Sequence, residues 1–173
     1  MRFKKPKFWD TKNISIWAIL LFPFSIIFII SSFISKFFKT KFSQKKNLIP
    51  VICVGNIYIG GTGKTPLAIE IFKFIKMIGK KPAFIKKGGE YLTDEVNMLK
   101  KIGKTFLSKK NRKNAINLAI SDKHDIVILD DGFQDFSIKH NFSILCFNSK
   151  QLVGNGLIIP SGPLRERLSA VSR

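Results

Sequence analysis

The sequence is poor in cysteine, histidine and acidic residues. Its 173 residues include only two cysteines and two histidines, and 11 Asp and Glu stand against 30 Lys and Arg. Two cysteines cannot form a disulfide framework, and there is no CxxC or Cys/His cluster of the kind that binds structural zinc. Cys53 and Cys146 each lie in a short apolar run, which is typical of small core residues in a reducing compartment.

The charge balance is strongly basic. The formal net charge is +19, of which residues 1–48 carry +9 and residues 49–173 carry +10. This excess indicates an anionic partner: nucleic acid, a lipid surface or a phosphorylated small molecule. Because the sequence has no helix-turn-helix, RNP or zinc-finger pattern, we expect no nucleic-acid partner. With 45% hydrophobic residues, the chain is not a disordered tail, and its length fits one domain with a short appendage.

A long uncharged run occupies residues 14–35. As a helix it would be roughly 33 Å long, enough for the hydrocarbon core of a bilayer. Basic residues flank it on both sides, no A-x-A-like cleavage site follows, and Pro23 lies near its middle. We therefore expect residues 1–48 to associate with a membrane, with a helix that spans it or dips into one leaflet and is kinked or broken at Pro23. A cleaved signal peptide and a buried helix of a soluble protein are the alternatives.

A glycine-rich segment follows the β-rich run at residues 50–54. Its residues are, in order, Gly60, Gly61, Thr62, Gly63, Lys64 and Thr65. A helical apolar pattern comes next and ends near Gly79. This is the context of a phosphate-binding P-loop, in which backbone N–H groups face phosphate oxygens, the lysine reaches the β- and γ-phosphates and the threonine ligates Mg²⁺. The strict pattern has glycine at position 58, where this chain has Tyr58, so the loop is a variant.

A second apolar run, at residues 125–129, ends in Asp130-Asp131-Gly132. An acid at the end of a buried strand is where a Walker B carboxylate holds the Mg²⁺ shell. Because sites collect at the carboxyl ends of the strands in an open α/β sheet, we expect both motifs at the same edge. Thr65, Asp130 and Asp131 are therefore the predicted magnesium residues.

Strand and helix patterns alternate over the rest of the chain. We expect strands at residues 82–86, 105–108 and 142–147 and helices at residues 94–102 and 113–121. This order predicts an α/β fold of the P-loop NTPase type over residues 49–173, with a mostly parallel sheet flanked by helices.

Together these motifs resemble those of the tetraacyldisaccharide 4'-kinases, the lipid A 4'-kinase family. The matching segments are Val54-Gly55-Asn56, residues 60–66, Asp130-Asp131-Gly132-Phe133-Gln134, Gly154-Asn155-Gly156 and residues 160–166. The family also begins with a basic, hydrophobic segment. The resemblance covers nearly all of this chain, while family members continue well beyond residue 166. It therefore implies that the chain corresponds to the N-terminal lobe and lacks the C-terminal one.

The resemblance implies a kinase of lipid A biosynthesis that uses ATP and Mg²⁺. Such an enzyme transfers the γ-phosphate to the 4' hydroxyl of an acylated glucosamine disaccharide 1-phosphate, among membrane lipids at the cytoplasmic face of the bacterial inner membrane. Lys64 would act on the phosphates, and Gln134 would help the glycine-rich loop to bind the nucleotide. Asp94 would orient or deprotonate the acceptor hydroxyl, although an acid there also suits the first turn of a helix. Arg165 and Glu166 would lie at the rim of the site.

The chain departs from the family pattern at two places. The motif Asp-Asp-Gly-x-Gln-His ends in Asp135 in place of histidine, and the segment Ser-Arg-Gly-Tyr-Gly is replaced by Lys86-Lys87-Gly88-Gly89-Glu90. One alternative function is therefore a membrane-anchored nucleotide-binding lobe that transfers no phosphate. Another is a membrane-associated P-loop ATPase, which only the loop and the strand acid support.

Overall fold

The computed structural model describes residues 5–43, 47–89, 93–108 and 111–169. The flanking residues Arg2, Lys4, Lys45 and Lys46, and Glu90 of the replaced segment, lie outside these ranges. Two compact units are formed. The first, here called the sheet unit, comprises residues 39–55 and 63–146, and the second, the helix unit, comprises residues 1–38, 56–62 and 147–173. The functional division after residue 48 stays a prediction.

The sheet unit is built on five strands in the order β3-β2-β4-β1-β5, and each neighbouring pair is parallel. Its elements are β1 (Val51–Gly55), α2 (Lys64–Met77), β2 (Pro82–Lys87), α3 (Thr93–Ile102), β3 (Thr105–Ser108), α4 (Arg112–Ser121), β4 (Ile126–Asp130) and β5 (Phe142–Leu145). Parallel strands need crossover connections, which the helices supply. The predicted α/β fold with a parallel sheet is therefore confirmed.

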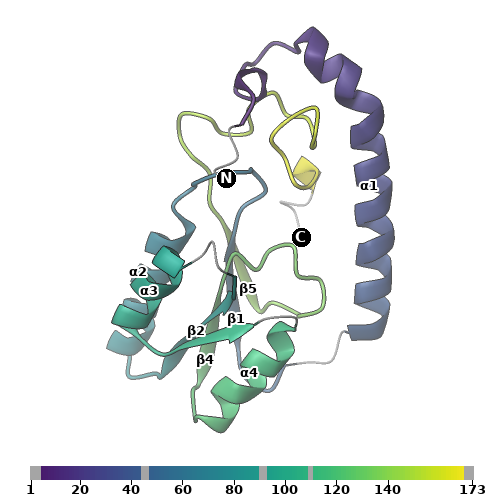
Figure 1. The fold of residues 1–173 in the computed structure, drawn as a ribbon. Coiled ribbons are helices and arrows are strands. Elements are labelled where there is room, and N and C mark those ends of the chain that lie inside the picture. The colour runs from purple at the N-terminus through teal and green to yellow at the C-terminus, as the bar shows by residue number, and fades with distance from the viewer. Residues whose placement is uncertain (1–4, 44–46, 90–92, 109–110, 170–173) are drawn as a thin grey trace. The chain divides into compact units, whose positions relative to one another are not determined.

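Helices cover both faces of this sheet, with α2 and α3 on one face and α4 on the other (Figure 1). A strand covered on both faces needs a continuous apolar run, which β1 and β4 have. The observed bounds of most helices and strands agree with the predicted ones to within one residue. However, β5 ends at Leu145, two residues before the predicted end.

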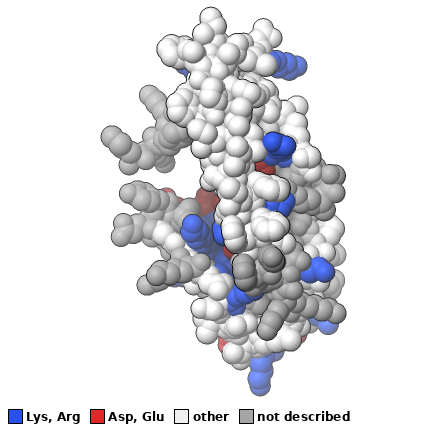
Figure 2. Space-filling view, turned by 90° about the vertical axis from the view of Figure 1, so that its right-hand side faces the viewer, with Lys and Arg blue, Asp and Glu red and all other residues white. Residues whose placement is uncertain are grey.

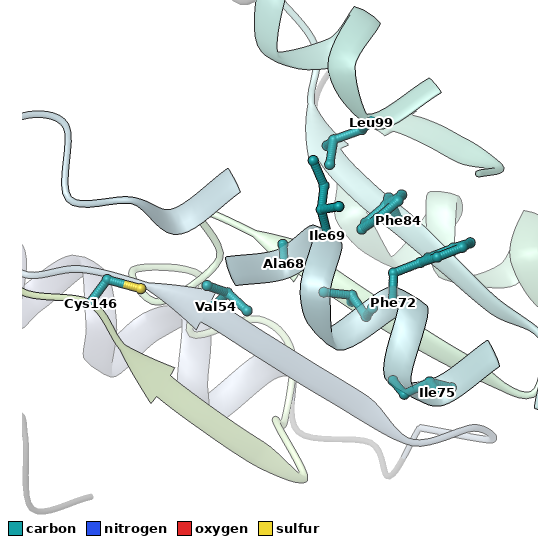
Figure 3. Packing of buried hydrophobic residues seen from close by; sticks show 9 residues of the cluster. Val54, Ala68, Ile69, Phe72, Ile75, Phe84, Leu99 and Cys146 are labelled. Atoms are coloured by element: carbon teal, nitrogen blue, oxygen red, sulfur yellow. The ribbon is translucent and has the colours of Figure 1, made fainter. Parts of the chain in front are cut away.

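The core of the sheet unit lies between α2 and the strands (Figure 3). The buried face of α2 consists of Ala68, Ile69, Phe72 and Ile75, which repeat at helical spacing. Phe72 stacks on Phe84 of β2 with ring centroids 4.5 Å apart. Gly103 is required beside them, because a Cβ there would lie 2.1 Å from Phe72 Cζ. This packing fixes α2, and with it the first helical turn that carries Lys64 and Thr65.

Both cysteines belong to the interior of the sheet unit. Cys53 and Cys146 are buried and free, as predicted. Burial raises the pKa of the Cys53 thiol to about 12. Because the thiolate is the reactive form of cysteine, this environment makes Cys53 a packing residue.

The helix unit contains most of α1 (Ile16–Ser43), which runs as one continuous helix through Pro23. Of the two expected effects of Pro23, a break is therefore wrong, since proline removes only one hydrogen bond of the helical ladder. A kink at Pro23 stays a prediction. Residues 16–40 are long and apolar enough to cross a membrane, by length and composition only, and they contain an 18-residue stretch with a mean hydropathy of 2.4. Only 11% of that stretch is buried, which distinguishes it from the core helix of a soluble protein.

Small and polar residues line the shielded face of α1. Ala18 and Ser25 are buried there at a spacing of seven residues, or two helical turns. Ser25 Oγ donates a hydrogen bond to the carbonyl of Ile158 at 2.8 Å and accepts one from the Ser161 amide at 3.1 Å. Most of the large apolar side chains of α1 consequently face outward, while Leu21 and Ile29 are half-buried.

The remainder of the helix unit is an irregular C-terminal segment. Beside it, the short helix η1 (Lys7–Trp9) inserts the buried Trp9 ring, whose Nε1 donates to the Pro160 carbonyl at 3.0 Å. Gly154 is required at this contact, because a Cβ there would lie 2.2 Å from the carbonyl oxygen of Trp9.

Candidate phosphate and magnesium site

The first turn of α2 forms one wall of the site. Gly63 precedes the helix with φ 77°, a left-handed conformation that glycine adopts without strain. The free N–H groups and the positive dipole end of the helix therefore start at Lys64, where the N–H groups can donate to an anionic oxygen. Lys64 Nζ lies 3.8 Å from Asp131 Oδ1, and Thr65 is buried at the next position.

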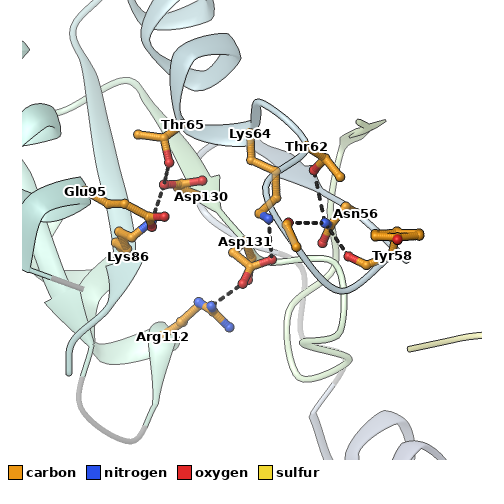
Figure 4. Close-up of polar contacts among 11 residues, drawn as sticks. Asn56, Tyr58, Thr62, Lys64, Thr65, Lys86, Glu95, Arg112, Asp130 and Asp131 are labelled. Carbon is orange, nitrogen blue, oxygen red and sulfur yellow. Dashed lines mark hydrogen bonds and ion pairs between the residues drawn. The ribbon is translucent and has the colours of Figure 1, made fainter. Parts of the chain in front are cut away.

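The end of β4 forms the opposite wall, because β1 and β4 are paired with Val54 beside Asp130. Asp130 is fully buried, and its Oδ2 accepts a hydrogen bond of 2.9 Å from Thr65 Oγ1. Asp131 has φ 58°, and its amide donates to the Val54 carbonyl at 2.9 Å. The structure thus brings together Lys64 and the three predicted magnesium residues, as Figure 4 shows.

Close packing explains the residues around these acids. A Cβ on Gly132 would lie 2.7 Å from the Cβ of Leu129, and one on Gly55 would lie 2.4 Å from the Cβ of Phe133. Both glycines therefore let the turn after β4 lie directly against the end of β1. Gln134 is half-buried in the same turn, and its role in nucleotide binding stays a prediction.

The sequence reasoning did not place Lys86 in this site. Lys86 is almost fully buried, its Nζ forms an ion pair with Asp130 Oδ2, and it lies 2.6 Å from Glu95 Oε2 of α3. Burial by itself lowers the pKa of Lys86, but the charge of Asp130 and the hydrogen bonds to Asp130 and Glu95 outweigh it and hold that pKa above its usual value. Its burial could have been predicted from its position in the strand. Side chains two residues apart on a strand point to the same face, so Lys86 shares a face of β2 with the core residue Phe84.

Arg112 was also not predicted. It lies in the first turn of α4, behind the N-cap residue Asn111. Its Nη2 donates to the main-chain carbonyl of Asp131 at 2.8 Å, and its Nη1 lies 2.9 Å from Asp135 Oδ2. Burial raises the pKa of Asp135, but hydrogen bonds from Ser137 and Arg112 outweigh it, so that pKa lies below its usual value. Asp135 therefore holds the Arg112 side chain, which in turn donates to the main chain of the turn after β4.

Asp94 lies in the first turn of α3 with an exposed side chain. Its neighbour Glu95 contacts Lys86, so the start of α3 is tied to the end of β4. The proposed part of Asp94 in activating the acceptor hydroxyl stays a prediction.

The glycine-rich residues 56–62 belong to the helix unit, where Asn56 organises them. Buried Asn56 donates through Nδ2 to the Tyr58 carbonyl at 2.6 Å and to Thr62 Oγ1 at 3.0 Å. Gly60 has φ 137°, a backbone conformation that L-residues rarely adopt. The conformation of this loop therefore depends on the side-chain amide of Asn56 and on the backbone freedom of Gly60.

Tyr58, at the position of the missing glycine, is buried in the helix unit. Its hydroxyl donates to Asp10 and accepts from Lys5 Nζ at 3.0 Å. Burial and the hydrogen bond to Asp10 raise the pKa of Tyr58. The variant loop thus exchanges glycine for a side chain that anchors residues near the N-terminus.

Arg165 and Glu166 lie beside the same loop. The Ile59 amide donates to the Pro163 carbonyl at 2.9 Å, and the Arg165 amide donates to the Ile57 carbonyl at 2.7 Å. Two segments about a hundred residues apart in sequence are therefore joined by their main chains. Both side chains are partly exposed, and their placement at the rim of the active site stays a prediction.

A parallel sheet with Gly-Lys-Thr after β1 and two acids at the end of the adjacent β4 defines an α/β protein of the P-loop type. The profile of the tetraacyldisaccharide-1-P 4'-kinase (LpxK) family matches residues 17–93 and 86–173. The chain belongs to this family.

Individual relatives agree with this assignment. The tetraacyldisaccharide 4'-kinase of Pelagibacter ubique (strain HTCC1062) is 49% identical over 169 residues, which are 98% of this chain and 52% of that protein. That of Psychromonas ingrahamii is 34% identical and matches 90% of this chain and 55% of its own length. The crystal structure of LpxK from Aquifex aeolicus in complex with ATP superposes with a TM-score of 0.73 at 26% identity, over 90% of this chain and 56% of that one. The chain spans about half the length of the curated relatives it matches.

Proposed function

We propose that the chain is the nucleotide-binding lobe of a tetraacyldisaccharide 4'-kinase and transfers the γ-phosphate of ATP to the 4' hydroxyl of an acylated glucosamine disaccharide 1-phosphate. The observation that carries the proposal is the cluster of Lys64, Thr65, Asp130 and Asp131 at one edge of the sheet. Phosphoryl transfer needs positioning and charge neutralisation more than covalent catalysis, and these residues supply both.

The residues present fit a magnesium ion. Asp130 Oδ1 is buried and accepts no hydrogen bond from the residues that the structure describes, so a ligand oxygen is available beside the Thr65 hydroxyl. Oxygen donors of this kind suit Mg²⁺. Asp130 and Thr65 would hold the ion, with Asp131 near it, and bound Mg²⁺ neutralises charge on the β- and γ-phosphates.

The chain's own residues have separate parts in the reaction. Lys64 and the first N–H groups of α2 would bind the phosphate oxygens. Asp94 would accept or orient the proton of the 4' hydroxyl, whose oxygen forms the new bond to phosphorus while the bond between the β–γ bridging oxygen and the γ-phosphorus breaks and leaves ADP. Arg165 and Glu166 would contact the substrate at the rim.

We also propose that α1 lies in the cytoplasmic leaflet of the inner membrane with its apolar face in lipid. Its shielded face carries the hydrogen bonds of Ser25, and its outward face is almost free of charge (Figure 2). Lysines near both ends would attract anionic lipid. An amphipathic placement of this kind favours a helix that dips into one leaflet.

A transfer assay tests the proposal. The 173-residue chain is placed in mixed micelles with radiolabelled ATP, Mg²⁺ and the acylated disaccharide 1-phosphate, and label in the lipid phase is followed. We expect label above that of Lys64→Ala, with Lys73→Ala, an exposed lysine of the same helix, equal to the wild type. A folded chain that binds ATP but labels no lipid would contradict transfer and leave a nucleotide-binding lobe.

A further inference from the structure

Lys86 is a buried charge that joins two elements of the sheet unit. It is 2% exposed, and its ammonium contacts Asp130 at the end of β4 and Glu95 in the first turn of α3. Placing a lysine in the interior costs free energy that only well-placed carboxylates offset. Its neighbour Lys87 is exposed. The burial of Lys86 is therefore specific to this position and to these two acids.

The two oxygens of Asp130 differ in their surroundings. Oδ2 accepts from Thr65 and contacts Lys86, whereas Oδ1 is buried without a hydrogen-bond donor among the described residues. One oxygen of the carboxylate is thus neutralised by an internal cation. The other oxygen belongs to the same carboxylate, which these two contacts hold in place, and it has no donor among the described residues.

We propose that Lys86 is a positioning residue which holds Asp130 and sets the divalent-cation affinity of the phosphate site. The proposal rests on the proposed function for the magnesium role of Asp130 and goes beyond it. The contact to Lys86 occupies Oδ2 and leaves Oδ1 for the cation, while the charge of Lys86 repels that cation, and we expect the repulsion to be the larger of these two effects. The half-exposed carboxylate of Glu95 partly neutralises the Lys86 ammonium and so reduces its repulsion of the cation.

The charges around the site support this assignment. Asp130, Asp131 and Glu95 carry three negative charges, against which Lys64 and Lys86 carry two positive ones. Because the net negative charge of the site is small, the electrostatic attraction of a divalent cation is weak until nucleotide phosphates are bound. We therefore expect the nucleotide-free chain to bind divalent cations weakly. Removal of the Lys86 charge should strengthen that binding.

The test measures Mn²⁺ binding to the full chain in detergent by the electron paramagnetic resonance signal of free Mn²⁺, with and without ATP. We expect Lys86→Met to lower the Kd for Mn²⁺ at least tenfold, while the matched control Lys87→Met changes it less than twofold. Lys86→Arg retains the charge and should stay within threefold of the wild type. Glu95→Gln leaves the ammonium less neutralised and should raise the Kd at least threefold.

The Kd for Mn²⁺ is expected to fall in Lys86→Met and to rise in Glu95→Gln. These opposite shifts distinguish the proposed role from a structural one, because a distorted site would raise the Kd in both variants. Equal or weaker Mn²⁺ binding by folded Lys86→Met would overturn the proposal. If Lys86→Met does not fold, Glu95→Gln decides, and unchanged or tighter binding by that variant overturns it. A wild-type chain that binds ATP but no Mn²⁺ would instead contradict the magnesium part of the proposed function.

Discussion

In the sheet unit, Lys86 and Asp130 are 2% and 0% exposed, whereas in the helix unit Trp17, Phe24 and Phe33 are 66%, 59% and 68% exposed. At these positions both units thus reverse the usual distribution of charged and apolar side chains. The buried charges of Lys86 and Asp130 neutralise one another. In the proposed function, nucleotide phosphates would complete the first region and lipid would cover the second.

The largest effect is expected where a buried charge loses its partner. Asp130→Asn leaves the Lys86 ammonium buried with only half-exposed Glu95, which should lower the free energy of unfolding by about 3–5 kcal/mol. Urea denaturation followed by circular dichroism measures it. Vesicle binding should not change, since α1 is untouched. A loss below about 1 kcal/mol would show that Asp130 is not the main partner of Lys86.

A charge on the apolar face of α1 should act on membrane binding alone. Phe24→Glu should weaken partitioning into phosphatidylglycerol vesicles roughly tenfold to hundredfold, because an acid in the acyl region is costly and an aromatic contact is lost. Vesicle flotation gives the partition coefficient. Met77→Glu is the control, since it puts the same charge on an exposed apolar position of α2 and should bind as the wild type does. Equal loss in both variants would mean that net charge, and not the α1 face, governs binding.

These two regions also show what could be predicted from the sequence. Strands and helices alternate with clear apolar patterns, so the parallel sheet and the meeting of Thr65 with Asp130 followed from the order of motifs. Lys86 did not, because its partners lie on β4 and α3 and only the folded sheet brings them together. The length of α1 was also underestimated. Lysine and phenylalanine are compatible with a helix, so the end of the uncharged run at residue 35 did not mark its end.

The Arg112–Asp135 pair in the sheet unit should give a pH-dependent contribution. The pKa of Asp135 lies below its usual value in the folded chain, so its stabilisation is complete above the unfolded pKa, near 4, and is lost as the pH falls through the folded pKa. Asp135→Asn should therefore cost about 1–2 kcal/mol at pH 6 and less at pH 3. Urea midpoints at the two pH values test this. A difference between variant and wild type that grows toward low pH would contradict the sign.

The smallest effect on membrane partitioning is expected at Ser25, a buried polar residue on the shielded face of α1. Ser25→Ala removes the donor to the Ile158 carbonyl and the acceptor of the Ser161 amide, at a cost of about 1 kcal/mol per bond. Because the apolar face is unchanged, vesicle partitioning should stay within twofold of the wild type, while proteolysis of the C-terminal segment should become faster. Ser32→Ala, on the same face, is the control that should leave the cleavage rate unchanged. If Ser25→Ala cleaves at the wild-type rate as well, the serine does not hold the C-terminal segment. The hydrophobic packing around Ala18 and Trp9 must then account for its order.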